Sequence, residues 1–208
     1  LGVVYADTAR ELFGKLPTES LYDFVGVDDS EKPFDPIGRK VQKRYRWLIL
    51  NLVTTFMAGG IILMFQDTLD ALVFLSVYIP VIAGMGGNAA TQSFAIMVRG
   101  LTLGTVALEN SWRAIWNELW AGCLNGFIIG AIVAIVSLVW QGDIWIGLVV
   151  GSSLIGAHMI AGLSGALIPL VMKHIGKDPA ATSTIFITTV TDVFGLLLLL
   201  GLATIFLL

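Results

Sequence analysis

One acidic residue stands alone in a long apolar segment. Asp192 is the only charged residue between positions 179 and 208. A charged side chain at the centre of a bilayer costs roughly 2.5–3.5 kcal/mol on insertion scales, so such a residue usually has a function. Four residues share its face at helical spacing: Thr184, Thr188, Thr191 and Gly195. Hydroxyls bonded back to their own helix would explain the threonines but not Asp192, for which we expect a role in an ion pathway.

A second polar run, GMGGNAATQS at 84–93, interrupts the apolar segment 71–98. Its glycines allow a close helix approach or expose backbone carbonyls, and Asn88, Thr91 and Gln92 add side-chain oxygens. The functional interpretation is a lining of oxygen ligands opposite Asp192. The alternative is small-residue helix packing, with Asn and Gln bonding between helices. Pro80 is expected to kink this helix.

Oxygen ligands with a single carboxylate favour a hard cation. Mg²⁺ dehydrates reluctantly and usually keeps several waters, which suits one aspartate with carbonyl and amide oxygens. Soft transition metals prefer Cys, Met or His ligands, which the presumed pore face lacks, whereas Ca²⁺ and Mn²⁺ stay open. Because one acid is little charge for a divalent ion, a twofold dimer that joins two copies of Asp192 would supply two charges.

Composition places these residues in a membrane protein. The 208 residues are 13% charged and carry a net charge of −3, whereas soluble domains are about 25% charged. The acidic balance argues against a nucleic-acid partner. Five segments are long and apolar enough to span a bilayer: 47–66, 71–98, 119–142, 144–172 and 179–208. We predict an all-α, five-span pore domain at 47–208, after a cytoplasmic tail at 1–46.

Basic residues between the spans predict the orientation. Residues 39–46 hold five bases and no acid, and the loops at 99–118 and 173–178 also carry Lys or Arg. The loops at 66–70 and 141–143 carry acids alone. We therefore expect the N-terminus inside and the C-terminus outside, in the inner (plasma) membrane. The basic helix near 36–46 is either an anchor on anionic lipid or a segment that touches the transport path.

Several runs resemble the MgtE family of magnesium channels over roughly residues 20–208, in the same order: PVIAGMGGNAATQS, VRGL, KHIGKDPA and TTVTDVFG. The resemblance implies a homodimer whose pore follows the subunit interface, lined by the second and fifth spans. It assigns the central magnesium-binding carboxylate to Asp192 and a pore carbonyl one turn earlier to Thr188. The family's GGN motif corresponds to Gly86, Gly87 and Asn88.

The resemblance also implies a magnesium site at the cytoplasmic mouth. Asp178 would belong to it, residues 36–46 would form a plug helix, and Asp28 and Asp35 are candidate acidic partners. Helix N-capping beside proline explains Asp178 and Asp35 equally well. The family usually carries an acidic helical domain and paired CBS domains before the membrane part, whereas 46 residues precede the first span here and the chain begins with Leu. We treat it as a fragment or processed product and expect no magnesium sensing by those domains.

These features predict a homodimeric channel or transporter that passes largely hydrated Mg²⁺ into the cytoplasm, with Mg²⁺ also as a gating ion. An inside-negative potential contributes about 2.3 kcal/mol per charge per 100 mV, so no further energy source is required. The alternative is an ion-coupled secondary carrier of divalent cations with Asp192 as its coupling site. An enzyme is not expected, because the spans lack a cluster of acids, histidine or a serine–base pair. The lone His158 is interpreted as packed and hydrogen-bonded, and Asn125 as a packing residue.

Overall fold

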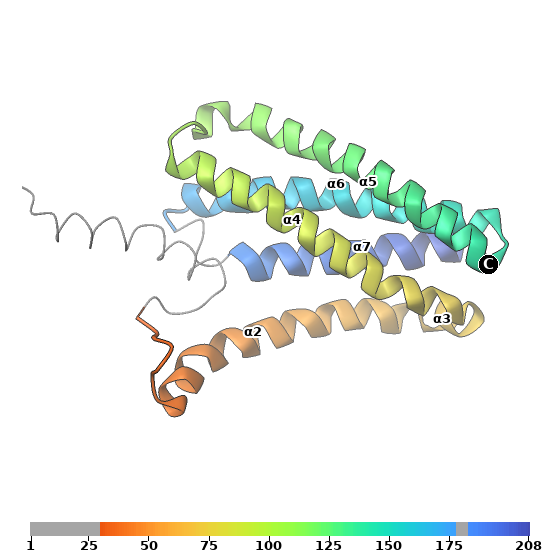
Figure 1. Cartoon of the computed structure of the whole chain (residues 1–208), viewed down its shortest axis with the longest axis horizontal. Helices are drawn as coiled ribbons and strands as arrows, with labels where there is room; N and C mark the ends of the chain where they lie inside the picture. The colour runs from red at the N-terminus through yellow and green to blue at the C-terminus, as the bar shows by residue number, and fades with distance from the viewer. Residues whose placement is uncertain (1–29, 178–182) are drawn as a thin grey trace, which may run out of the picture.

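The computed structural model describes residues 30–177 and 183–208, and every regular element within these ranges is a helix (Figure 1). The elements are α2 (Ile37–Met64), α3 (Gln66–Ala71), the 3₁₀ helix η1 (Val73–Val77), α4 (Tyr78–Thr102), the 3₁₀ helix η2 (Leu108–Asn110), α5 (Ser111–Gln141), α6 (Ile144–His174) and α7 (Ser183–Phe206). Five helical segments of the described chain are long and apolar enough to cross a membrane, with η1 and α4 forming one of them. The predicted all-α fold with five long apolar helices is therefore confirmed.

Helix α6 is the centre of the bundle. It packs against α4, α5 and α7, and it lies between α5 and α7 in Figure 1. Glycines bring the backbones of α5 and α6 together: a Cβ added to Gly122 would lie 2.3 Å from the carbonyl oxygen of His158, and one added to Gly130 would lie 2.6 Å from that of Gly151. Small residues at such crossings are typical of membrane helices, which associate through close backbone packing.

Helix α2 is peripheral, because among the long helices it packs mainly on α7 and buries only Ala58. It begins at Ile37, ten residues before the span predicted at 47–66, so the basic segment and the first span form one continuous helix. Most of its apolar surface is exposed in the single chain. That surface is left for lipid or for another protein chain.

Helix α5 also begins earlier than predicted, at Ser111 rather than at 119. The predicted apolar segment starts directly after the charged Glu118. The helix itself begins before this residue, with its N-cap at Asn110. Asp192 is therefore joined by a second acid within the long apolar helices, since Glu118 lies in the third of them. Its surroundings are described below.

Pro80 does not interrupt a helix. It is the third residue of α4, directly after η1, and the first turn of a helix tolerates proline because its N–H groups have no partner within the α-helix. The expected kink at Pro80 is therefore not found; the 3₁₀ helix η1 changes to the α-helix α4 just before this residue. Among the prolines of the described helices, Pro169 lies in a helix interior, that of α6.

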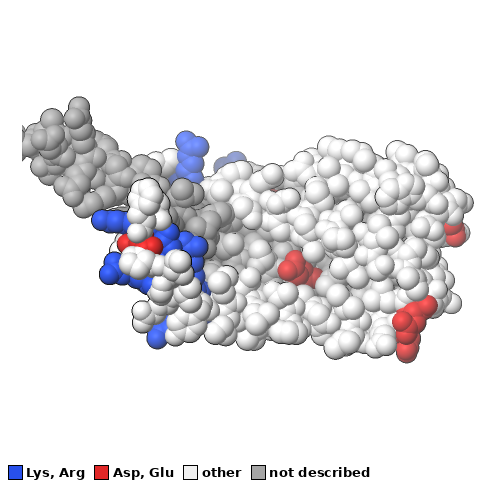
Figure 2. Space-filling model, turned by 60° about the horizontal axis from the view of Figure 1, so that its bottom comes forward, with Lys and Arg blue, Asp and Glu red and all other residues white. Residues whose placement is uncertain are grey.

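Basic residues gather at one end of the molecule. Figure 2 shows Lys and Arg at this end with some acidic residues among them, further acidic residues at the opposite end, and an acidic patch midway on an otherwise uncharged face. Asp67 and Asp70, expected in a loop, lie on the short helix α3 and are exposed. Thr68 between them is buried, and its hydroxyl lies 2.7 Å from that of Thr204, which holds α3 against the end of α7.

Candidate functional site

Helices α4 and α7 pack side by side where each carries a glycine. A Cβ added to Gly86 of α4 would lie 3.6 Å from the Cβ of Thr191, and one added to Gly195 of α7 would lie 2.9 Å from Cγ2 of Ile82. The structure therefore brings the glycine run of α4 against the polar part of α7. Sequence reasoning expected these two segments to face each other.

The threonines of this region bond back to their own helices. Thr188 Oγ1 lies 3.0 Å from the carbonyl oxygen of Thr184 and 3.1 Å from that of Ile185. Thr191 donates to the Thr188 carbonyl at 3.0 Å, and Thr91 donates to the Gly87 carbonyl at 2.9 Å. The alternative explanation of the threonines is thus confirmed, although each carbonyl keeps a further lone pair that can accept.

Thr191 does not share the surroundings of Asp192. The side chain of Thr191 is 1% exposed and packs against α4, whereas Asp192 is half-buried. Within the described residues, the carboxylate of Asp192 has neither a hydrogen bond nor an ion pair. An intramembrane acid without a protein partner is available to a cation or to water.

Gly87 and Asn88 follow the buried Gly86 and turn away from the α4–α7 contact. Gly87 is half-buried with nothing near its missing side chain, and Asn88 is exposed. The described residues contain no group of three or more His, Cys, Asp or Glu side chains placed to hold a metal ion. Gly87 and Asn88 are thus on α4, and Thr188 and Asp192 on α7, next to the place where Gly86 meets Thr191, and the described residues form no metal cage there.

The residues expected at the cytoplasmic mouth are only partly described. Asp28 and Asp178 lie outside the described residues. Asp35 accepts a hydrogen bond from the Lys32 backbone N–H at 3.0 Å and contacts Arg39 at 3.5 Å. The Lys32 bond, supported by the charge of Arg39, holds the pKa of the Asp35 carboxyl below its usual range. The N-cap of α2 is Pro36, without a side-chain cap, so Asp35 stabilises the preceding turn and does not cap the helix.

Sequence reasoning missed Glu31. Its carboxylate accepts two hydrogen bonds from the guanidinium of Arg44, at the start of α2, and its side chain is 3% exposed. These bonds hold the pKa of Glu31 below its usual range. The segment before α2 is thus folded back onto the basic turns of that helix.

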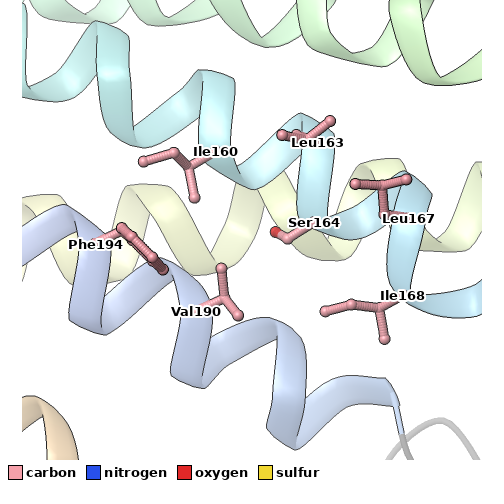
Figure 3. A pocket seen from close by; sticks show the side chains of 7 residues that line it. All are labelled: Ile160, Leu163, Ser164, Leu167, Ile168, Val190 and Phe194. Carbon is pink, nitrogen blue, oxygen red and sulfur yellow. The ribbon is translucent and has the colours of Figure 1, made fainter. Parts of the chain in front are cut away.

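A cavity with a volume of about 360 Å³ lies between α6 and α7. Figure 3 shows side chains of both helices pointing toward it: Ile160, Leu163, Ser164, Leu167, Ile168, Val190 and Phe194. Ser164 is the polar side chain of this lining, and its hydroxyl donates to the carbonyl oxygen of Ala161 at 3.2 Å. The lining side chains include no carboxylate and no amide. This cavity suits apolar groups and not a cation.

The fold and the α4–α7 region define a multi-pass membrane protein with a carboxylate inside its helical bundle. The chain belongs to the MgtE family, whose sequence model, described as a divalent cation transporter, matches residues 79–202. The matched range includes Asn88 and Asp192. The family is one of transporters, which confirms the expectation that the chain is not an enzyme.

Three relatives, each named "Magnesium transporter MgtE", align with almost the whole chain. The protein of Bacillus subtilis (strain 168) is 38% identical over 99% of this chain and 48% of its own length. The protein of Enterococcus faecalis is 32% identical, with 99% and 45% covered, and that of Thermus thermophilus is 29% identical, with 98% and 45% covered. The chain thus spans about half the length of these curated relatives.

Proposed function

We propose that two copies of this chain form a channel in the plasma membrane that passes largely hydrated Mg²⁺ into the cytoplasm. The observation that carries the proposal is the half-buried carboxylate of Asp192, which has no partner among the described residues and lies beside the glycine contact of α4 and α7. The relatives named as magnesium transporters support Mg²⁺ as the ion.

The position of Asp192 suits a site inside the membrane. It is nine residues after the start of α7 at Ser183, which is about 14 Å along the axis at 1.5 Å per residue. A hydrated Mg²⁺ that keeps its waters needs oxygen acceptors at some distance rather than a tight cage. We assign this role to Asp192, with the Thr188 carbonyl, Gly87 and Asn88 shaping the path.

A second copy of the chain would complete the site. One carboxylate compensates half the charge of a divalent ion, and twofold symmetry around the exposed side of α4 and α7 would place two carboxylates about one axis. Asn88 and most of the apolar surface of α2 are exposed in the single chain, which leaves surface for a partner protomer. The pore would then follow the interface, with α4 and α7 lining it.

The cytoplasmic mouth is proposed to carry a gating site for Mg²⁺. Asp178, Asp28 and Asp35 would supply carboxylates to it, and the plug would be the basic part of α2 near 36–46, continuous with the first span. Asp35 already bonds to Lys32 and Arg39, so a metal would compete with these contacts for its oxygens. This favours a weak site that fills when cytoplasmic Mg²⁺ is high.

Reconstituted flux separates a channel from a coupled carrier. The chain is placed in liposomes that contain a Mg²⁺-sensitive dye, and a potassium diffusion potential is imposed without pH or Na⁺ gradients. A channel is expected to admit Mg²⁺ at a rate that rises with inside-negative potential, because the ion carries two charges. Flux that appears only after a pH or Na⁺ gradient is added would instead support a carrier. Absence of Mg²⁺ flux both with and without these gradients would overturn both proposals.

A further inference from the structure

A second polar region lies within the bundle, between α4, α5 and α6. It is a partly open cavity of about 130 Å³. Its polar side chains come from all three helices: Gln92, Ser93, Glu118, Asn125 and His158. Asn125 was interpreted as a packing residue, but it is exposed and lies near the middle of α5. A polar cavity among apolar helices must be filled by water, an ion or a polar group.

Glu118 is the charged residue of this cavity. The hydroxyl of Ser93 donates a hydrogen bond to its carboxylate, which leaves further acceptor positions on the two oxygens. Among residues 30–177 and 183–208, no Lys or Arg forms an ion pair with Glu118. A carboxylate inside a membrane helix without a basic partner is costly, so a bound cation would offset its charge.

The cavity is held open by rigid backbone packing. A Cβ added to Gly162 of α6 would lie 2.4 Å from the carbonyl oxygen of Glu118, so the backbones of α5 and α6 touch at this residue. His158, which is 2% exposed, is also fixed, because its Nδ1 lies 2.8 Å from the Leu154 carbonyl oxygen. The volume corresponds to about four waters at about 30 Å³ each. The space therefore suits an ion that keeps part of its hydration shell.

This cavity is distinct from the region around Asp192. Its lining comes from α4, α5 and α6, whereas Asp192 is on α7. The two acids also lie at different levels along α4, because Glu118 bonds to Ser93 whereas Thr191, the neighbour of Asp192, lies against Gly86. Ser93 is seven positions after Gly86, which is about 10 Å along the helix axis.

We propose that each protomer holds a second cation site in this cavity, where Glu118 binds a partly hydrated hard divalent cation. The amide oxygens of Gln92 and Asn125 are the further oxygen donors, and the Ser93 hydroxyl orients the carboxylate. With a single charged ligand the site is weak and fills only at high concentrations of the cation. Because it does not include Asp192, binding here does not depend on the proposed function.

The test counts Mn²⁺, a probe that takes the same oxygen ligands as Mg²⁺, by electron paramagnetic resonance on the detergent-solubilised 208-residue chain carrying Asp192→Asn. Adding Glu118→Gln is expected to weaken one Mn²⁺ site per chain at least tenfold. Glutamine keeps an acceptor for the Ser93 hydroxyl but removes the charge. Glu109→Gln, at an exposed acid of η2, is the matched control and should leave binding unchanged.

Two further variants separate ion binding from a structural role. Asn125→Leu, at an exposed position, should weaken the same Mn²⁺ site several-fold without touching Glu118. Ser93→Ala should retain most of the Mn²⁺ binding, because the charge stays. If Glu118→Gln leaves Mn²⁺ binding unchanged, the cavity holds water or a proton and the proposal is overturned. It is equally overturned if Ser93→Ala abolishes binding while Glu118→Gln does not.

Discussion

Asp192 and Glu118 are both acids within long helices, and they differ in their partners. Glu118 accepts a hydrogen bond from Ser93, whereas Asp192 has no partner among the described residues. Asp192 could be predicted from the sequence because it interrupts thirty otherwise uncharged residues. Glu118 could not, because it adjoins a charged loop and only the helix that continues through it places it in the bundle.

Glu31 shows a second limit of sequence reasoning at the residue scale. Arg44 lies thirteen positions further along the chain, and no helical or strand spacing relates the two positions. Their contact exists because the turn at 32–35 reverses the chain, as the bond from the Asp35 N–H to the Lys32 carbonyl at 3.1 Å records. A pattern search along the chain does not find a contact of this kind.

Arg44→Gln is expected to release the segment before α2. The guanidinium of Arg44 donates both of its hydrogen bonds to Glu31, and a glutamine cannot replace this paired, charged contact. A spin label at Lys32 should become more mobile in the Arg44→Gln variant. Arg46→Gln is the control, because Arg46 contacts Tyr45 instead. Equal mobility in the two variants would contradict this assignment.

The same contact predicts a pH dependence. Because Arg44 holds the pKa of Glu31 below its usual range, the contact contributes stability above the ordinary carboxyl pKa of about 4.3, and this contribution is lost as the pH falls through the lower folded-state pKa. The Lys32 label should therefore gain mobility on acidification below that range. An identical acid transition in Arg44→Gln would show that another group is responsible.

At the scale of elements, the number and order of the long helices could be predicted, and several of their ends could not. Turn residues marked the junction of α5 and α6 well: Gly142 has a φ of 72°, and the Asp143 carboxylate accepts from the Trp145 N–H at 2.8 Å. The start of α5 differs from the predicted span because charged residues continue this helix beyond the apolar segment. The basic helix expected near 36–46 runs on into the first span as α2. Hydropathy indicates which part of a helix suits the membrane. It does not indicate at which residue the backbone hydrogen bonds of the helix end.

Close packing of α4 on α6 depends on Gly165. A Cβ added there would lie 2.6 Å from the Ala90 carbonyl oxygen and 2.7 Å from the Ser93 Cβ, so Gly165→Ala must push α4 away. We expect a loss of about 1–3 kcal/mol in unfolding free energy, measured by denaturation in mixed micelles. Gly86→Ala is the matched control, since its Cβ would make an ordinary 3.6 Å contact with Thr191. Equal stability of the two variants would contradict this view of the packing.

At the scale of the whole molecule, the separation of charge fits one orientation in the membrane. The basic ends of α4, α6 and the start of α2 lie together, and α3 and the α5–α6 turn lie at the opposite end (Figures 1 and 2). Lys and Arg favour the cytoplasmic side. The sequence alone predicted this orientation because loop charge, unlike tertiary packing, is local in the chain. The pairing of helices needed the structure, because the five spans are all apolar.

Cysteine labelling tests the orientation. In a Cys123→Ser background, Asp143→Cys should react with a membrane-impermeant maleimide added outside intact cells. Lys173→Cys should react only after the cells are permeabilised, since the basic ends are expected inside. Both positions lie next to helix ends, which makes their accessibility comparable. The reverse pattern of labelling would contradict the proposed topology.

The most direct test of Asp192 as the conduction carboxylate is Mg²⁺ flux into liposomes that contain the Asp192→Asn chain. Asparagine keeps the size of the side chain and removes its charge, so folding should be retained while attraction of the cation is lost. We expect Mg²⁺ uptake to fall at least tenfold, with wild-type uptake in the Asp143→Asn control, whose carboxylate is at the start of α6. Wild-type flux and selectivity over Ca²⁺ in Asp192→Asn would contradict the central claim.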